Sequence, residues 1–116
     1  MRALSVLGST GSIGRQTLEV AAACGHRVLA LTAHHNIALL EQQARTFHPI
    51  LAAAADPTAA AALAMRLSDT DIRVLAGEEG VLAAFRQLSG YGEMLAGLNE
   101  LDDAALLRLL RENSFT

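Results

Sequence analysis

The sequence predicts a single α/β domain in which a partial parallel sheet of about four strands carries helices on its faces. Short apolar runs alternate with longer segments whose apolar residues recur at helical spacing, and this alternation continues from residue 3 to about residue 90. The hydrophobic residues make up 52% of the chain but only 3% is aromatic, so aliphatic side chains must build the core. A chain of 116 residues has the length of one domain.

The expected elements follow each other in four strand–helix pairs. We expect strands at residues 3–7, 26–31, 50–54 and 72–75, and helices at about 13–24, 37–47, 57–67 and 81–90. Gly25 is expected to end the first helix in a left-handed conformation, Pro49 to end the second, and Asp56 with Pro57 to begin the third. The expected buried positions of the first and third helices are Ile13, Thr17, Leu18, Ala21, Ala60, Leu63, Ala64 and Leu67.

The last part of the chain has a different character. We expect residues 1–90 to form the domain and residues 91–116 to form a helical tail, because no strand pattern occurs after residue 90. Residues 102–111 begin with acidic and end with basic side chains, an order that favours a C-terminal helix.

Composition excludes several classes of function. The net charge of −3, with no basic cluster, argues against a nucleic-acid partner. No apolar run reaches the ~18 residues of a membrane span, and the N-terminus lacks a signal-peptide pattern, so we expect no membrane association and a cytoplasmic location. Cys24 is the only cysteine, which excludes an internal disulfide, and we expect it to be a small buried apolar residue.

A glycine pattern, Gly8-x-x-Gly11-x-x-Gly14, lies between the first expected strand and the first expected helix. This context is typical of a Rossmann-like unit that binds a dinucleotide: Gly8 permits a sharp turn, Gly11 allows the backbone to approach a pyrophosphate, and Gly14 allows close packing of the helix. Backbone N–H groups at the helix start would face the phosphates. The hydroxyl groups of this segment are additional candidate donors, from Ser9, Thr10 and Ser12.

The end of the second expected strand bears on the choice of cofactor. An acidic residue there would bind the ribose hydroxyl of NAD, but the sequence offers Ala33, His34, His35 and Asn36 instead. NADP is therefore favoured over NAD, although His34 taken alone is more typical of a solvated loop residue. The two histidines lack a third ligand at useful spacing, so we expect no metal site.

Several segments within residues 1 to 85 are more specific than the glycine spacing alone. The strongest is Leu7-Gly-Ser-Thr-Gly-Ser-Ile-Gly14, followed by Gln16-Thr-Leu18. Further segments are Ala30-Leu-Thr-Ala-His-His-Asn36, Leu40-Glu-Gln-Gln-Ala44, Pro49, Ala55-Asp56 and Val74-Leu-Ala-Gly-Glu-Glu-Gly80. Together these segments, over roughly residues 1 to 85, resemble the N-terminal NADPH-binding domain of 1-deoxy-D-xylulose 5-phosphate reductoisomerase.

The resemblance implies an activity and a set of cofactor contacts. The complete enzyme, expected to be a homodimer, converts 1-deoxy-D-xylulose 5-phosphate to 2-C-methyl-D-erythritol 4-phosphate in isoprenoid precursor synthesis, with NADPH and Mg²⁺ or Mn²⁺. The resemblance places one group of residues at the cofactor's phosphates, namely Thr10, Gly11, Ser12 and Ile13, and another at its adenosine phosphate, namely His34, His35 and Asn36.

The sequence departs from the family at two places. The family has glycine and then Lys or Arg before Asn36, whereas this chain has His34 and His35. After Phe85 the family's apolar strand, Lys-Glu-Ser segment and metal-binding acids are not found, so we expect a truncated, frame-altered or excised half of the enzyme without catalytic or metal residues. A stand-alone dinucleotide-binding or regulatory module, and an α/β scaffold without a ligand, remain alternatives.

Overall fold

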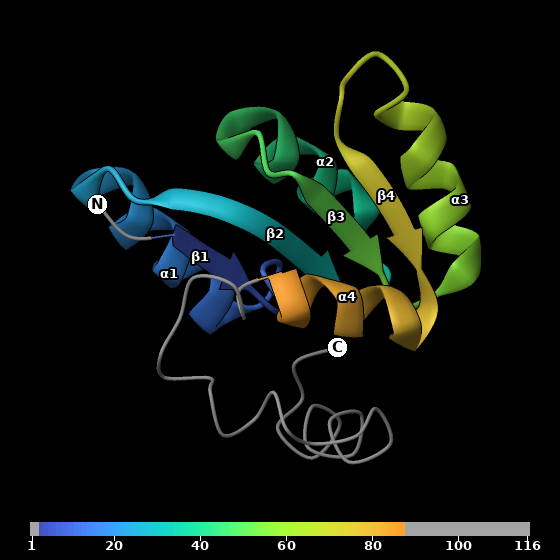
Figure 1. Ribbon diagram of the computed structural model, residues 1–116, viewed down its shortest axis with the longest axis horizontal. Coiled ribbons are helices and arrows are strands. Elements are labelled where there is room, and N and C mark those ends of the chain that lie inside the picture. The colour runs from blue at the N-terminus through green and yellow to red at the C-terminus, as the bar shows by residue number, and fades with distance from the viewer. Residues whose placement is uncertain (1–2, 88–116) are drawn as a thin grey trace.

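The computed structural model describes residues 3–87, which form a parallel four-stranded sheet with helices on both faces (Figure 1). The strands lie in the order β1-β2-β3-β4, and each pairs in parallel with the next. The elements are β1 (Ala3–Val6), α1 (Ser12–Cys24), β2 (Arg27–Ala33), α2 (Ile37–Phe47), β3 (Leu51–Ala54), α3 (Pro57–Arg66), β4 (Arg73–Ala76) and α4 (Gly77–Gln87). This arrangement confirms the Rossmann-like alternation. The expected helix at residues 102–111 lies outside the described residues.

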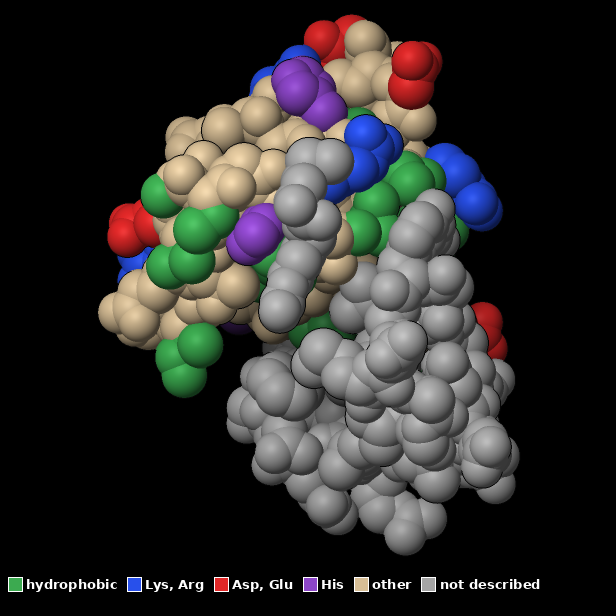
Figure 2. Space-filling model, turned by 60° about the vertical axis from the view of Figure 1, so that its left-hand side comes forward, with side chains coloured by type: hydrophobic (Ala, Val, Ile, Leu, Met, Phe, Trp, Pro, Cys, Tyr) green, Lys and Arg blue, Asp and Glu red, His purple; other side chains and the backbone are tan. Residues whose placement is uncertain are grey.

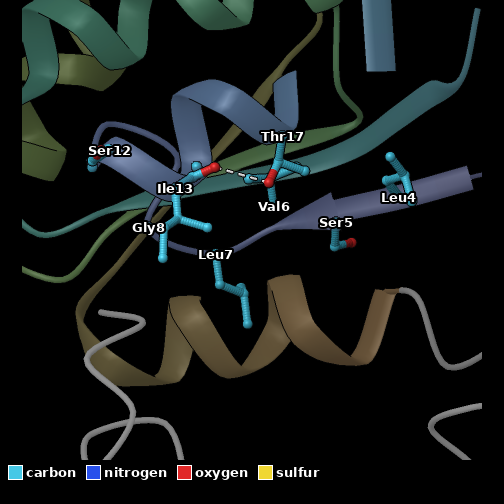
Figure 3. Close-up of a pocket in the computed structure, with 10 residues that line it drawn as sticks. Leu4, Ser5, Val6, Leu7, Gly8, Ser12, Ile13 and Thr17 are labelled. Atoms are coloured by element: carbon cyan, nitrogen blue, oxygen red, sulfur yellow. Dashed lines mark hydrogen bonds between the residues drawn. The ribbon is translucent and has the colours of Figure 1, made fainter. Parts of the chain in front are cut away.

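The helices divide between the two faces of the sheet. Leu18 of α1 packs with Val6 in the main core, which also includes Leu40 and Ala44 of α2, Leu63 of α3 and Leu67 directly after α3. A smaller cluster joins Leu7 and Ala30 to Ala84 of α4. Helices α1 to α3 therefore cover one face and α4 covers the other, with the end of β1 between them (Figures 1 and 3).

The predicted helix ends are confirmed. Gly25 is left-handed, with φ of 69°, and its N–H donates to the carbonyl of Ala22 at 3.3 Å. His48, before Pro49, is also left-handed and ends α2. The Asp56 carboxylate accepts a hydrogen bond from the Thr58 N–H at 3.2 Å and begins α3.

Some expected burial patterns are wrong. Ile13 is 79% exposed and Thr17 is exposed, because Gly14 instead turns toward the sheet, and the buried face of α1 consists of Gly14, Leu18 and Ala21. Ala64 is exposed, and Ala59 takes its place in the buried face of α3. Cys24 is exposed because it lies on the solvent side of the last turn of α1.

The fourth helix begins earlier than expected. It starts at Gly77, whose φ of 74° makes the turn out of β4, and Glu78 and Glu79 form its first turn. The apolar pattern alone marked a start at Val81, because the preceding turn is polar. Acidic residues in the first turn complement the positive end of the helix dipole.

An ion-pair network joins α2 to the turn after α3. The Arg45 guanidinium donates to both carboxylate oxygens of Asp69, at 3.0 and 2.9 Å, and to Glu41 at 3.1 Å. These hydrogen bonds from Arg45 lower the pKa of the Asp69 carboxyl group below its usual range. The network is exposed to solvent, so it adjusts stability rather than determining the fold.

Replacing Asp69 with asparagine should remove an acid-sensitive contribution to stability. Because the pKa of Asp69 is lowered in the folded state, its contribution is present above the ordinary carboxyl range and is lost as the pH falls through the folded-state value. Urea unfolding from about pH 5 down to about pH 3 should therefore show a smaller decline for Asp69→Asn than for the wild type. The control is Asp71→Asn, at a carboxylate with no ion pair among the described residues, and equal curves for the two variants would refute the assignment.

Candidate phosphate-binding site

The segment between β1 and α1 forms a tight turn at the carboxyl end of the sheet. Gly8 has φ of 71°, a left-handed conformation that side chains rarely adopt. The Gly11 N–H donates to the Gly8 carbonyl at 3.1 Å, and Gly11 is the N-cap of α1. The chain thus reverses from strand to helix within five residues and brings the first turn of α1 next to the end of β1.

Gly14 allows this turn to lie against the helix. A Cβ atom at Gly14 would lie 2.3 Å from the Gly8 carbonyl oxygen and 2.7 Å from the Cα atom of Ser9. Both neighbours are backbone atoms, so neither can move aside as a flexible side chain could. The requirement for glycine at this position therefore comes from packing inside the chain.

Gly11 differs from Gly14. Its backbone, with φ of −79° and ψ of 174°, is extended and open to any residue. A Cβ atom at Gly11 would meet only the Gly8 carbonyl oxygen, at the ordinary contact distance of 3.4 Å. Nothing inside the described fold requires glycine here, so the absent side chain leaves room for something outside the chain.

Unpaired donors flank Gly11 in the chain. Within residues 3–87, the backbone N–H groups of Thr10, Ser12 and Ile13 have no hydrogen-bond acceptor. The first N–H groups of a helix have no partner within the helix, and the helix dipole favours an anion near them. Donors of this kind, beside a glycine without steric hindrance, can bind a phosphate group.

A cavity of about 540 Å³ adjoins the first residues of α1, including Ser12 and Ile13, and continues along β1 (Figure 3). Ile13 and Thr17 reach it from α1, and the Thr17 hydroxyl donates to the Ile13 carbonyl at 2.9 Å. The Ser5 hydroxyl is buried without a partner among the described residues. The cavity is lined by Leu4, Ser5, Val6, Leu7, Gly8, Gly11, Ser12, Ile13, Gly14 and Thr17.

The loop after β2 lies at the same edge of the sheet, because β1 and β2 are parallel neighbours. His34 and His35 are exposed there, and their rings meet edge to face at 5.4 Å. The Asn36 side chain caps α2 by accepting from the Leu39 N–H at 3.3 Å. Ala33 is fully buried in β2, and its carbonyl accepts from the Ala55 N–H at 2.9 Å. The exposed side chains of His34 and His35 have no hydrogen-bond partner among the described residues, and the exposed Asn36 side chain uses only its oxygen.

The expectation that the Ser9 hydroxyl faces a ligand is wrong. Ser9 is fully buried, and its hydroxyl donates to Oε1 of Gln43 at 2.6 Å. Thr32 holds the same turn from β2, since its hydroxyl accepts from the Gly8 N–H at 2.9 Å. Neither Thr32 nor Gln43 is predicted from the sequence to hold this turn. The available signal was a polar residue, Gln43, on the otherwise apolar face of the helix that includes Leu40 and Ala44.

Among residues 3–87, neither the charged side chains visible on one face (Figure 2) nor the possible metal ligands gather into a second site. On the face shown in Figure 2, basic and acidic side chains are dispersed and do not gather into one patch. Among residues 3–87, no three His, Cys, Asp or Glu residues lie close enough together to hold a metal ion. No helix of the described part is long and apolar enough to cross a membrane.

Comparison with known proteins gives consistent matches. Residues 4–98 match the family model described as 1-deoxy-D-xylulose 5-phosphate reductoisomerase. The enzyme of that name from Moorella thermoacetica is 57% identical over 83 residues, which cover 70% of this chain and 22% of that protein. The one from Acetivibrio thermocellus is 53% identical over 78 residues, which cover 67% and 20%.

A solved structure shares the fold. The Zymomonas mobilis reductoisomerase in complex with NADPH aligns with a TM-score of 0.68 and 33% identity, over 72% of this chain and 22% of that one. This chain therefore spans about a fifth of the length of the relatives that it matches. The family match also continues to residue 98, beyond the end near residue 85 expected from the motifs.

Proposed function

Because this chain belongs to the 1-deoxy-D-xylulose 5-phosphate reductoisomerase family, we propose that it forms the NADPH-binding part of such an enzyme. The observation that carries the proposal is the contrast between Gly11 and Gly14. Gly14 is required by internal packing, whereas Gly11 leaves space beside unpaired backbone donors. A pyrophosphate has the charge and size for that position.

The residues of the turn would hold the cofactor by its pyrophosphate, mainly through backbone N–H groups. The N–H groups of Thr10, Ser12 and Ile13 would donate to phosphate oxygens, with the Thr10 and Ser12 hydroxyls as further donors. His34 and His35 would face the adenosine phosphate from the neighbouring loop. NADPH, when bound, supplies a hydride. These residues would orient the cofactor and exclude water from its phosphates.

The activity of the whole protein is part of the proposal. We propose the family reaction, which converts 1-deoxy-D-xylulose 5-phosphate to 2-C-methyl-D-erythritol 4-phosphate with NADPH and Mg²⁺ or Mn²⁺. Solved relatives include complexes with magnesium and with NADPH, fosmidomycin and magnesium. The catalytic and metal-binding groups would lie outside residues 3–87. A homodimeric state of the complete protein and a cytoplasmic location also belong to this proposal.

Purified chain should bind NADPH without turning over deoxyxylulose phosphate. The chain offers groups for the phosphates and the adenosine, but the reacting groups of the family are proposed to lie elsewhere. Calorimetric titration with NADPH measures binding, and the fall in NADPH absorbance with substrate and Mg²⁺ measures turnover. Turnover by the pure chain would overturn the assignment of catalysis to other segments, and absence of NADPH binding would overturn the proposed function.

Replacing His35 with arginine should increase the preference for NADPH over NADH. Arginine carries a permanent charge and can form two parallel hydrogen bonds to a phosphate, whereas the charge of histidine changes with pH in the range about 5 to 8. We expect the affinity ratio to rise by about tenfold, measured by paired titrations at neutral pH. His34→Arg is the comparison at the adjacent exposed position, where we expect a smaller rise in the ratio. If both variants leave the ratio unchanged, the two histidines are solvated loop residues.

A further inference from the structure

Gln43 of α2 contacts the phosphate-binding turn at two points, although it lies 34 residues away in the sequence. Its Nε2 group donates to the Ser9 carbonyl at 2.8 Å, and its Oε1 atom accepts from the Ser9 hydroxyl at 2.6 Å. Only this orientation of the amide satisfies both contacts, because a carbonyl oxygen cannot donate a hydrogen bond. Gln43 is 7% exposed and Ser9 is fully buried, so water does not compete for these groups.

The Ser9 backbone is also held from β2. Its N–H donates to the Thr32 carbonyl at 2.8 Å, and its hydroxyl lies 3.3 Å from the same oxygen. Thr32 is itself fully buried in the sheet. Both hydrogen-bonding groups of the Ser9 backbone are therefore directed into the protein, one by Thr32 and the other by Gln43.

The orientation of the Ser9 carbonyl determines the orientation of the next N–H. A peptide unit is planar, and in the trans form its C=O and N–H groups point in opposite directions. Residues 3–87 contain no cis peptide bond. Because Gln43 holds the Ser9 carbonyl toward α2, the Thr10 N–H points away from α2, and it has no acceptor within the described residues.

We propose that Gln43 is a positioning residue that presents the Thr10 N–H to the pyrophosphate of NADPH. This inference rests on the proposed function and adds a residue that touches no part of the cofactor. Without the Gln43 donor, the buried Ser9 carbonyl would lack a partner and the Ser9–Thr10 peptide could rotate to find one. Such a rotation would turn the Thr10 N–H away from the ligand.

The test compares two ligands on the whole chain, because a residue with a merely structural role would affect both equally. NADPH contains the pyrophosphate, whereas adenosine 2′-monophosphate lacks it. Gln43→Met keeps the length and shape of the side chain but removes its donor. We expect NADPH affinity to fall by about tenfold to a hundredfold, and the affinity for adenosine 2′-monophosphate to change by less than about threefold.

Ser9→Ala is the matched control. It removes the hydroxyl contact to Gln43 but leaves the Nε2 to Ser9 carbonyl hydrogen bond in place, so NADPH affinity should fall by less than about threefold. NMR titration measures both ligands even when binding is weak. An equal loss for both ligands in Gln43→Met, or a full loss in Ser9→Ala, would overturn the positioning role.

A measurement on the wild-type chain covers the case in which Gln43→Met does not fold. The Thr10 amide resonance should shift on addition of NADPH together with those of Ser12 and Ile13. If Ser12 and Ile13 respond and Thr10 does not, the Gln43 proposal is wrong while the proposed function stands. If none of the three responds, the proposed cofactor site itself is wrong.

Discussion

Valine at position 11 should eliminate measurable NADPH binding while the domain stays folded. The extended backbone of Gly11 accepts a β-branched residue, and its Cβ atom has room inside the chain. The valine methyl groups would instead occupy the space beside the donors of the α1 N-terminus, where the pyrophosphate is proposed to bind. We expect affinity to fall at least about a hundredfold, as measured by calorimetry.

Gly11→Ala provides a graded comparison, because its single methyl group should produce a smaller loss than valine. Circular dichroism and urea unfolding show whether each variant is folded. If a folded Gly11→Val chain binds NADPH with wild-type affinity, this turn does not bind the pyrophosphate.

Alanine at position 14 should have the reverse effect and destabilise the fold itself. The new Cβ atom would lie 2.3 Å from a backbone oxygen, so α1 must move away from the turn after β1. This helix contributes Leu18 and Ala21 to the main core, and the movement would loosen both contacts. We expect a loss of about 2 to 4 kcal/mol in the free energy of unfolding, measured with urea.

Gly11→Ala is the matched control, because it adds the same side chain three residues away in the same segment. Gly11→Ala should reduce stability by less than about 1 kcal/mol, the scale of an altered helix N-cap. If the two variants have equal free energies of unfolding, α1 can move away from the turn at Gly14 without a loss of stability, and the prediction is wrong.

The order of elements and several helix ends could be predicted because local chemistry determines them. Gly25 and the pair of Asp56 and Pro57 act through the backbone of neighbouring residues, so a short stretch of sequence contains the whole cause. The glycine spacing also located the candidate site, because each glycine acts within the turn that contains it.

The hydrogen bonds that hold the turn after β1 could not be predicted, because they come from residues that are distant in the sequence. Thr32 and Gln43 lie far from Ser9 in the sequence, and the packing of β2 beside β1 and of α2 on β2 brings them to the turn. The exposure of Ile13 had a similar cause, since the contact of Gly14 with the Gly8 carbonyl sets the rotation of α1 about its own axis. Helical periodicity finds an apolar stripe but cannot count a glycine as part of it.

The burial of Ser9 has a thermodynamic consequence for ligand recognition. Hydrogen bonds from two neighbouring elements restrict the turn before any ligand arrives. A loop that is already ordered loses little conformational entropy on association, so more of each phosphate contact remains as affinity. In the proposed complex, the exposed side chains of His34 and His35 would lose rotational freedom on meeting the adenosine phosphate, so these two residues would contribute less affinity for each contact than the turn.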